Sequence, residues 1–387
     1  MHQPVADPTP RVAPPSTTPS ALASHDVDTL ASWLAHRTGR CTATARRAAA
    51  KAMRHAWQRT DASPTWTDRA LQQDAGIGRW ARTALLELSP EPLLEAVQTV
   101  PSTDGSTRYL WKLRDDELIE SVVIPTAAAG HPHPRNTVCV SSQVGCARRC
   151  AFCESGRHGL RRQLGAAEIV DQVRLLRAER ARQAGEPLTN IVFMGMGEPL
   201  DNLPTVCRAI RLLCDPFGFG FAPSHVTVST VGIADRFAEF FASTRAELAV
   251  SLGAPDDDRR QQIIPAAQRF LLASIRDALL STLPRGRRVL FQYALFDRFN
   301  DSLADADALA ELVRPVRCRV NLLVANRGPA DHLRAPSPER VHAFARRLHR
   351  AGVRTILRAS RGADVGGACG QLAGAHRRDP LPSSPGE

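Results

Sequence analysis

The sequence predicts an α/β fold in which a parallel sheet curls into a barrel or partial barrel, preceded by a small helical domain and a β-hairpin. Three observations predict this fold. From residue 136 onward, apolar runs of strand length alternate with longer helical patterns. Before about residue 96, apolar residues recur at three- and four-residue spacing, which is typical of helices. Between these regions lie two short strand-like runs joined by a turn.

We expect five segments along the chain. Residues 1–24 are rich in Pro, Ser and Thr, so they cannot offset the entropy lost on ordering and are predicted to be a disordered tail. Residues 25–100 are predicted to form a helical accessory domain, and residues 101–130 a linking β-hairpin built from RYLWKLR and LIESVVIP. Residues 131–375 are predicted to form the barrel with a C-terminal cysteine loop, and residues 376–387 a second disordered tail.

Six strand-and-helix units make up the predicted barrel. Their strands are TVCVSS, NIVFMGM, HVTVST, ELAVSL, RVLFQYALF and RCRVNLLVA. Such apolar runs are typical of parallel strands buried on both faces. A last helix is predicted to start at Pro338 with Ser337 before it, and a final strand, RTILRAS, follows. In folds of this kind the loops at the carboxyl ends of the strands carry the functional site.

The composition is that of a globular protein. Of the 387 residues 43% are hydrophobic and 23% charged, which excludes full-length disorder. No run approaches the ~20 apolar residues of a membrane span, and the first residues lack a secretory signal pattern, so we expect a cytoplasmic protein without membrane contact. The net charge of +11 suits a polyanionic partner, although abundant Arg with scarce Lys is also explained by coding bias.

The strongest chemical signal is a cluster of cysteines in CVSSQVGCARRCAFCESG. Cys146, Cys150 and Cys153 have C-x3-C-x2-C spacing just after a predicted strand. Protein iron–sulfur clusters usually take four cysteines, so three would leave one iron of a 4Fe–4S cluster open to an exchangeable ligand. A structural zinc site needs a fourth ligand, for which His158 is the only nearby candidate, and buried free thiols are a third alternative. The aromatic Phe152 before the third cysteine favours the cluster.

This loop resembles the radical S-adenosylmethionine (SAM) superfamily. CVSSQVGC, VFMGMGEPLDN, VTVSTVGI, LAVSLGAPDD, VNLLVAN and ACGQL, in that order between Glu120 and Leu372, are similar to the radical SAM adenosine methyltransferases of ribosomal RNA, RlmN and Cfr. The resemblance implies a partial (βα)6 barrel, a 4Fe–4S cluster bound by the three cysteines, and two SAM molecules per turnover. It also implies methylation of C2 or C8 of adenosine in ribosomal or transfer RNA.

Several residues at predicted strand ends match positions that bind SAM in that family. On the residues alone, a glycine at a strand end lets backbone approach a ligand, and a carboxylate there can accept from an amine. Taken singly, such residues are more often bulges, turns or caps. The resemblance implies SAM binding by Gly197, Glu198, Ser229, Ser251, Leu252, Gly253 and Asn326.

Two further cysteines and one glutamate match the family's catalytic positions. The resemblance implies that Cys369 carries the methyl group, that Cys139 resolves the protein–RNA adduct by forming a disulfide with Cys369, and that Glu120 removes the ring proton. The family's radical is generated from the second SAM and abstracts hydrogen from the S-methyl group. Without the resemblance, a lone cysteine is most often a small buried hydrophobe and Glu120 a solvent-facing strand carboxylate.

The partners follow from the same resemblance. We expect RNA, an electron donor such as flavodoxin or ferredoxin, and a monomer. Arginines around the cysteine loop favour RNA contact, although an arginine run is usually a solvated face; they are Arg148, Arg149, Arg157, Arg161 and Arg162. The helical N-domain, with Arg46, Arg47, Lys51, Arg54 and His55, is a candidate RNA-docking module.

The chain departs from the family pattern at Gly253, Glu154 and Gly366–Gly367. We expect the cluster chemistry and the methyl carrier to be retained, so these departures concern the identity of the substrate. Two rival functions remain. One is radical methylation of a non-RNA substrate, and the other is a zinc-stabilised RNA-binding protein without catalysis.

Overall fold

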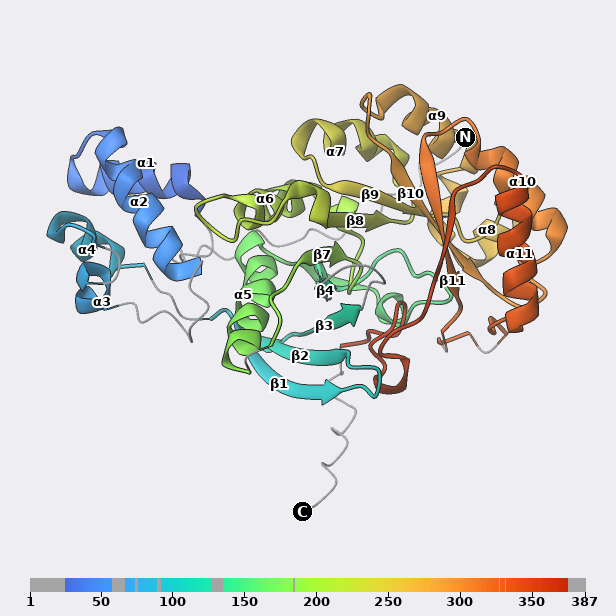
Figure 1. The fold of residues 1–387 in the computed structure, drawn as a ribbon, viewed down its shortest axis with the longest axis horizontal. Helices are drawn as coiled ribbons and strands as arrows, with labels where there is room; N and C mark the ends of the chain where they lie inside the picture. Colours follow the sequence, from blue (N-terminus) through green and yellow to red (C-terminus); the bar gives the residue numbers. More distant parts are fainter. Residues whose placement is uncertain are drawn as a thin grey trace, which may run out of the picture.

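The computed structural model describes residues 25–57, 67–73, 76–88, 92–126, 135–183, 185–326, 328–330 and 332–374. The two predicted tails, 1–24 and 376–387, lie outside these residues. A helical module comes first in the chain, and a single large sheet covered by helices follows it (Figure 1).

Within the described residues the large sheet has ten strands in the order β1-β2-β3-β4-β7-β8-β9-β10-β11-β12. The strands from β4 to β12 are parallel, and β1, β2 and β3 add an antiparallel edge. The sheet stays open, with β1 and β12 as its edges, so it is a partial rather than a closed barrel. The predicted α/β fold is confirmed. The strands are β1 (Leu94–Pro101), β2 (Thr107–Leu113), β3 (Leu118–Thr126), β4 (Arg135–Cys139), β7 (Asn190–Phe193), β8 (Val226–Thr230), β9 (Glu247–Ser251), β10 (Val289–Leu295), β11 (Cys318–Val324) and β12 (Thr355–Arg358).

Helices connect the parallel strands and cover the outer face of the sheet (Figure 1). They are α5 (Ala166–Arg182), α6 (Leu203–Cys214), α7 (Phe237–Ser243), α8 (Asp257–Ile263), α9 (Leu272–Thr282), α10 (Leu303–Val313) and α11 (Pro338–Arg350). The predicted start of α11 is confirmed, since the Ser337 hydroxyl caps the helix by accepting from the backbone N–H of Arg340. A small hairpin of β5 (Gln143–Gly145) and β6 (Leu160–Gln163) lies beside the sheet.

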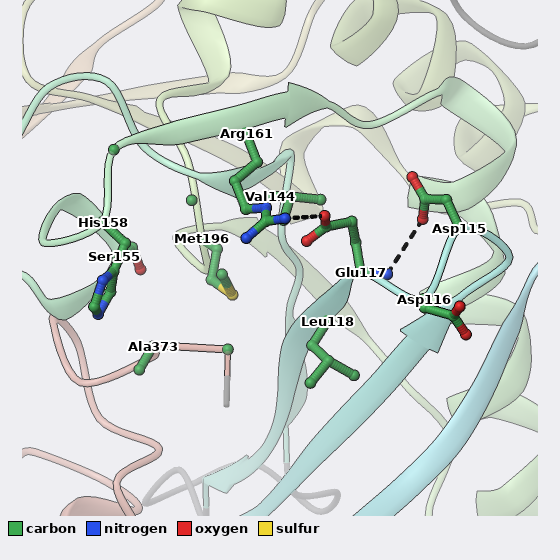
Figure 2. Close-up of a pocket in the computed structure, with 13 residues that line it drawn as sticks. Asp115, Asp116, Glu117, Leu118, Val144, Ser155, His158, Arg161, Met196 and Ala373 are labelled. Atoms are coloured by element: carbon green, nitrogen blue, oxygen red, sulfur yellow. Dashed lines mark hydrogen bonds and ion pairs between the residues drawn. The ribbon is translucent and has the colours of Figure 1, made fainter. Parts of the chain in front are cut away.

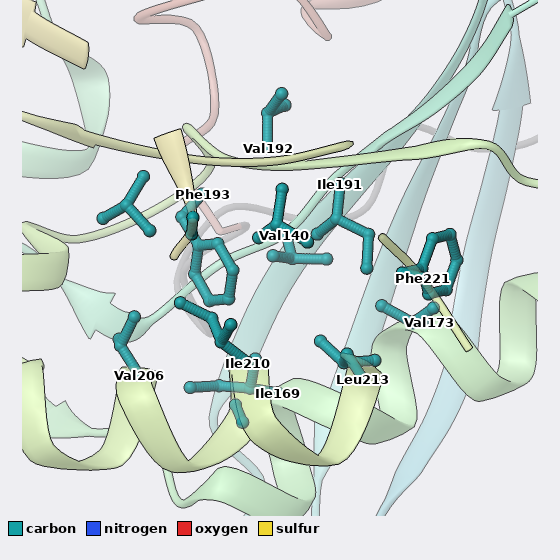
Figure 3. Packing of buried hydrophobic residues seen from close by; sticks show 14 of the residues in the cluster. Val140, Ile169, Val173, Ile191, Val192, Phe193, Val206, Ile210, Leu213 and Phe221 are labelled. Carbon is teal, nitrogen blue, oxygen red and sulfur yellow. The ribbon is translucent and has the colours of Figure 1, made fainter. Parts of the chain in front are cut away.

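The core lies between the sheet and these helices. Figure 3 shows part of this core. Ile169 and Val173 of α5 and Ile210 of α6 pack with Ile191 of β7 and with Val140, the residue directly after β4. All five are buried. Burying each such side chain contributes roughly 1.5–3 kcal/mol, so this layer holds the carboxyl ends of β4 and β7 at fixed positions.

The N-terminal module consists of α1 (Val27–Thr38), α2 (Thr42–Trp57), α3 (Asp68–Gln73) and α4 (Arg79–Leu85). It contacts the loop after α6, where Trp57 stacks on Phe219 with ring centroids 5.2 Å apart. The guanidinium groups of Arg46 and Arg54 lie over the ring of Phe217. These two basic residues therefore attach the module to the barrel.

The predicted helical domain extended to residue 100, and this boundary is wrong. The last helix of the module ends at Leu85, and Leu94–Pro101 form β1, which pairs antiparallel with β2. A bulge between Ala96 and Gln98 interrupts the alternation of inward and outward side chains. That interruption removes the two-residue period by which a strand is recognised.

Within the described residues, no helix is both long enough and apolar enough to cross a bilayer.

Candidate active site

The three clustered cysteines lie on the loop between β5 and β6, at the carboxyl-end side of the barrel. Backbone bonds hold this loop: Cys146 N–H donates to the carbonyl of Gly159 at 3.0 Å, and Ala151 N–H to that of Ile263 at 2.9 Å. Cys150 is packed in an apolar cluster with Ile263, Ile264, Ala267, Phe296 and Leu333, against which Phe152 and Cys153 also pack.

Burial makes the thiolate forms of these three cysteines unfavourable unless a positively charged group binds them. Desolvation by burial raises the pKa of Cys146 to about 12, and it also raises the pKa of Cys150 and Cys153. The thiols interact electrostatically with one another, so their thiolate forms need a positive partner, which iron supplies. In the described part of the chain, no three His, Cys, Asp or Glu side chains converge on one metal ion.

Gly197 and Glu198 follow β7 and lie against the start of the cysteine loop. Gly197 has φ +103°, and a Cβ there would lie 2.6 Å from Cβ of Gln143, so glycine is required for both conformation and space. The Glu198 carboxylate is buried and accepts from the backbone N–H groups of Leu200 at 2.9 Å and Val231 at 2.8 Å. Desolvation raises the pKa of Glu198 to about 7.

Ser229 at the end of β8 and Ser251 at the end of β9 share one hydrogen-bond acceptor, the side chain of Gln292, which the sequence did not indicate as a site residue. Both hydroxyls donate to Oε1 of Gln292, at 3.2 and 3.4 Å. Gln292 is buried in β10, where it pairs in register with the buried Asn321 of β11. The signal available in the sequence was a glutamine inside the apolar strand RVLFQYALF. These groups make the barrel interior polar at this level.

Leu252 and Gly253 follow β9, and a second missed residue, Arg260 of α8, supports them. Arg260 has 0% of its surface exposed and donates to three backbone carbonyls: Leu252 at 2.9 Å, Phe270 at 2.6 Å and Val231 at 2.7 Å. Desolvation lowers its pKa to about 10. The guanidinium is also within electrostatic range of Cys150, so it places a positive charge beside the cysteine loop.

Cys139 and Cys369 are separated by most of the barrel sequence, and the structure brings them together. Cys139 ends β4 and is buried, while Cys369 is exposed on the segment after β12. Burial raises the pKa of Cys139 to about 12, with a further contribution from the nearby Cys369 thiol. Cys369 also interacts electrostatically with Cys153 of the cysteine loop. The Cys369 thiol is therefore within electrostatic range of both Cys139 and Cys153.

The segment carrying Cys369 rests directly on the cysteine loop. Glu154 N–H donates to the carbonyl of Gly370 at 2.8 Å, and Ser155 Oγ donates to that of Leu372 at 2.5 Å. Asn326, predicted to bind SAM, is close to this segment, because its amide donates to the carbonyl of Cys369 at 3.1 Å. Asn326 thus connects the end of β11 with the backbone of Cys369.

Glu120 lies on β3, with 1% of its surface exposed. Without the resemblance it was expected to face solvent, and the structure contradicts that expectation. Its carboxylate is paired with Arg108 of β2 and accepts from the backbone N–H groups of Ala373 at 2.8 Å and Gly374 at 3.0 Å. In the strand register Val122 of β3 pairs with Cys139, so Glu120 lies two residues along β3 from the partner of Cys139, and its carbonyl accepts from Ser141 Oγ at 2.6 Å.

A pocket opens beside this carboxylate site. Figure 2 shows Ser155 and His158 of the cysteine loop on one side, Ala373 of the C-terminal segment below, and Leu118 with Met196 between them. The turn between β2 and β3 forms the opposite wall, where Glu117 pairs with Arg161 at 2.7 Å. The pocket therefore lies where the cysteine loop, the hairpin and the C-terminal segment meet.

Comparison with known proteins follows the same lines. The radical SAM superfamily model matches residues 140–310. A probable RNA methyltransferase of Sorangium cellulosum is 54% identical over 94% of this chain and 90% of its own length. The dual-specificity RNA methyltransferase RlmN of Anaeromyxobacter sp. strain Fw109-5 is 41% identical over 79% of this chain and 80% of its own length. The chain belongs to the RlmN family of radical SAM methyltransferases.

A solved structure agrees with this placement in the RlmN family. A radical SAM methyltransferase from Sphaerobacter thermophilus superposes with a TM-score of 0.77 at 37% identity, covering 92% of this chain and 99% of its own. The described fold therefore has the architecture of a radical SAM methyltransferase over most of the chain.

One departure from the RlmN-family pattern has a local structural reason. Gly253 has φ +76°, and a Cβ there would lie 2.8 Å from Cδ1 of Ile264. Any larger residue at this position would therefore meet backbone strain and a side-chain contact together. Its carbonyl accepts from the Asn300 amide at 2.7 Å, which holds the glycine in place.

The arginines near the cysteine loop differ in availability for RNA. Arg148 pairs with Asp201, Arg161 with Glu117, and Arg162 with Asp115 and Glu168. Arg149 is exposed, and no ion pair is found for it within the described residues. Arg157 lies 3.8 Å from Glu154, so four of the five arginines predicted to contact RNA are ion-paired.

Proposed function

We propose that this RlmN-family chain methylates an aromatic ring carbon, C2 or C8, of adenosine in ribosomal or transfer RNA, through a methyl group carried on Cys369. The observation that supports it most is that the segment carrying Cys369 is hydrogen-bonded to the loop of Cys146, Cys150 and Cys153, with Cys369 within electrostatic range of Cys139. The names of the relatives, which are RNA methyltransferases, support RNA as the substrate.

The proposed reaction requires two bound groups, a 4Fe–4S cluster and SAM. Cys146, Cys150 and Cys153 would hold a 4Fe–4S cluster in their apolar surroundings, and Gly197, Glu198, Ser229, Ser251, Leu252, Gly253 and Asn326 would surround SAM. When bound, the pair supplies methyl groups and the one-electron chemistry that an unreactive C–H bond requires, with two SAM molecules used per turnover. An electron donor such as flavodoxin or ferredoxin would supply the electron.

The chain's own residues account for the rest of the reaction. The Cys369 thiolate would accept a methyl group by nucleophilic displacement, and the exposed position of Cys369 gives it access to RNA. After the methyl carbon has joined the adenine ring, Glu120 would remove the ring proton. The Cys139 thiolate would then attack the Cys369 sulfur, which forms a disulfide and breaks the bond between that sulfur and the carbon. The electron pair of the broken bond goes to the carbon, which takes up a proton and leaves with the RNA as a methyl group, and external reduction resets the disulfide.

The assay that tests this function uses the anaerobically reconstituted full-length chain with labelled SAM, a reductant and ribosomal or transfer RNA. We expect label in methyladenosine, and nucleoside mass spectrometry against C2 and C8 standards assigns the carbon. Unmodified RNA from a cluster-replete protein would contradict the RNA substrate and favour another acceptor. A preparation that binds zinc and shows no iron–sulfur absorbance would favour the non-catalytic rival. We expect a monomer acting in the cytoplasm.

SAM binding is expected to depend on pH through Glu198. Its carboxyl, with a pKa of about 7, is ionised above that pH and protonated below it. Only the ionised form attracts the SAM ammonium group, so affinity at pH 6 should be about tenfold weaker than at pH 8. Equilibrium binding of labelled SAM to the cluster-replete protein measures this. The Glu198→Gln variant should bind weakly without the pH step, and a flat wild-type profile would rule out this role of Glu198.

A further inference from the structure

The segment that carries Cys369 is held at both of its ends by carboxylates. At the first end, the turn between β1 and β2 holds the short helix Ala363–Val365. Asp104 accepts from Gly362 N–H at 2.8 Å, while Asp364 accepts from Thr103 N–H at 3.0 Å and from Ser102 Oγ at 2.6 Å. Figure 1 shows the segment after β12 running back to the end of the β1–β2 hairpin.

At the second end, one oxygen of Glu120 accepts both Ala373 N–H and Gly374 N–H, at 2.8 and 3.0 Å. The fit around this end is close. A Cβ on Gly374 would lie 2.9 Å from the Leu118 carbonyl and 3.0 Å from Cε of Met196. Between the two ends, the carbonyls of Gly370 and Leu372 accept from Glu154 N–H and Ser155 Oγ of the cysteine loop, and Cys369 is within electrostatic range of Cys139.

Arg108 is ion-paired with the other carboxylate oxygen of Glu120. One of its terminal nitrogens donates to Oε1, and the Arg108 side chain is 24% exposed against 1% for Glu120. Burial of a carboxylate without a partner is costly, and the ion pair with Arg108 offsets that cost. Gly367 packs on this arginine, since a Cβ on Gly367 would be 3.6 Å from Cβ of Arg108. Arg108 thus touches both the carboxylate and the segment that the carboxylate holds.

We propose that Glu120, oriented by Arg108, is a latch that seats the Cys369 segment on the barrel mouth, and that Arg108 is a positioning residue. The proposal rests on the proposed function for its catalytic meaning. While the segment is seated, Arg108 occupies one carboxylate oxygen and two backbone N–H groups occupy the other. Glu120 becomes free to take a ring proton only when the bonds to Ala373 and Gly374 break. Release of the segment and proton removal are therefore coupled through one carboxylate.

Hydrogen exchange of the cluster-replete full-length chain, without RNA or SAM, tests the latch directly. In Glu120→Ala the amides of Ala373 and Gly374 lose a charged acceptor, so they should exchange about tenfold faster or more. Arg108→Ala should give a smaller increase, and Arg108→Lys should restore protection in part. Cys139 is buried, and Gly367 of the segment lies against Val122, the strand partner of Cys139. Cys139 should therefore be alkylated faster in both alanine variants, as measured by peptide mass spectrometry.

The matched control is Glu95→Gln on β1, the strand that pairs with β2 on the side away from Glu120, where Glu95 is an exposed partner of Lys112. It should leave exchange in residues 366–374 unchanged. Glu120→Gln keeps one acceptor oxygen and should lie between wild type and Glu120→Ala. Wild-type exchange and wild-type Cys139 alkylation in both alanine variants would overturn the latch. Because neither readout needs turnover, a chain that fails to methylate RNA can still show the latch, and the two proposals fail separately.

Discussion

Cys369→Ala is expected to abolish both RNA methylation and protein–RNA crosslinking. The exposed Cys369 thiol is the group that would carry the methyl carbon, whereas Cys139 is buried at the end of β4. A buried thiol has no access to RNA, so Cys139 cannot replace Cys369 as the carrier. Anaerobic turnover with labelled SAM and gel analysis of the protein–RNA species measure both losses.

Cys139→Ala is the informative counterpart. Without Cys139 the adduct between Cys369 and RNA has no thiol to resolve it, so a covalent protein–RNA species should accumulate and no product should be released. Cys207→Ala is the matched control, because Cys207 is buried in α6, among the residues of the hydrophobic core. Full activity of Cys369→Ala would eliminate the carrier role, and product release by Cys139→Ala would eliminate the resolving role.

Arg260→Met is expected to lower the free energy of unfolding by about 3–5 kcal/mol. Methionine has a similar length but donates no hydrogen bond, so the carbonyls of Val231, Leu252 and Phe270 would be left buried without their donor. Two of these carbonyls belong to the loops after β8 and β9, next to the predicted SAM contacts. The midpoint of urea unfolding, followed by circular dichroism, measures the loss.

The control is Arg269→Met on the adjacent turn. Arg269 is exposed and pairs with Asp235 at 2.9 Å, so its replacement should change stability by about 1 kcal/mol or less. Arg260→Lys keeps the charge and part of the bonding, and should fall between Arg260→Met and wild type. An unfolding midpoint for Arg260→Met equal to that of wild type would show that these three bonds are dispensable.

The barrel was predictable from the sequence because its signals are local. Runs such as NIVFMGM and RVLFQYALF are apolar, short and followed by helical patterns, and each feature is visible within a few residues. The cysteine loop was visible for the same reason, since Cys146, Cys150 and Cys153 lie within eight residues. The strand β1 was not predicted, because the bulge between Ala96 and Gln98 interrupts the alternation of inward and outward side chains by which a strand is recognised.

Other parts of the site depend on contacts between distant segments. Gln292 is a single polar residue in an apolar strand, and only the sheet order places it between Ser229 and Ser251. In the sequence nothing distinguishes Arg260 from the other arginines. Only packing in the folded protein buries it against three backbone carbonyls. Neither role leaves a pattern in neighbouring residues.

The sequence by itself determined the α/β class, the barrel strands, and the three cysteines of the candidate cluster, because short-range spacing and apolar periodicity encode each of them. Only the tertiary structure decided that Cys369 returns to Cys139 and that Glu120 with Arg108 holds the returning segment. The physical reason is the connectivity of the chain. A contact between β3 and residues 373–374 spans more than two hundred residues, and only the folded sheet, which sets strand order and register, brings its partners within hydrogen-bond distance.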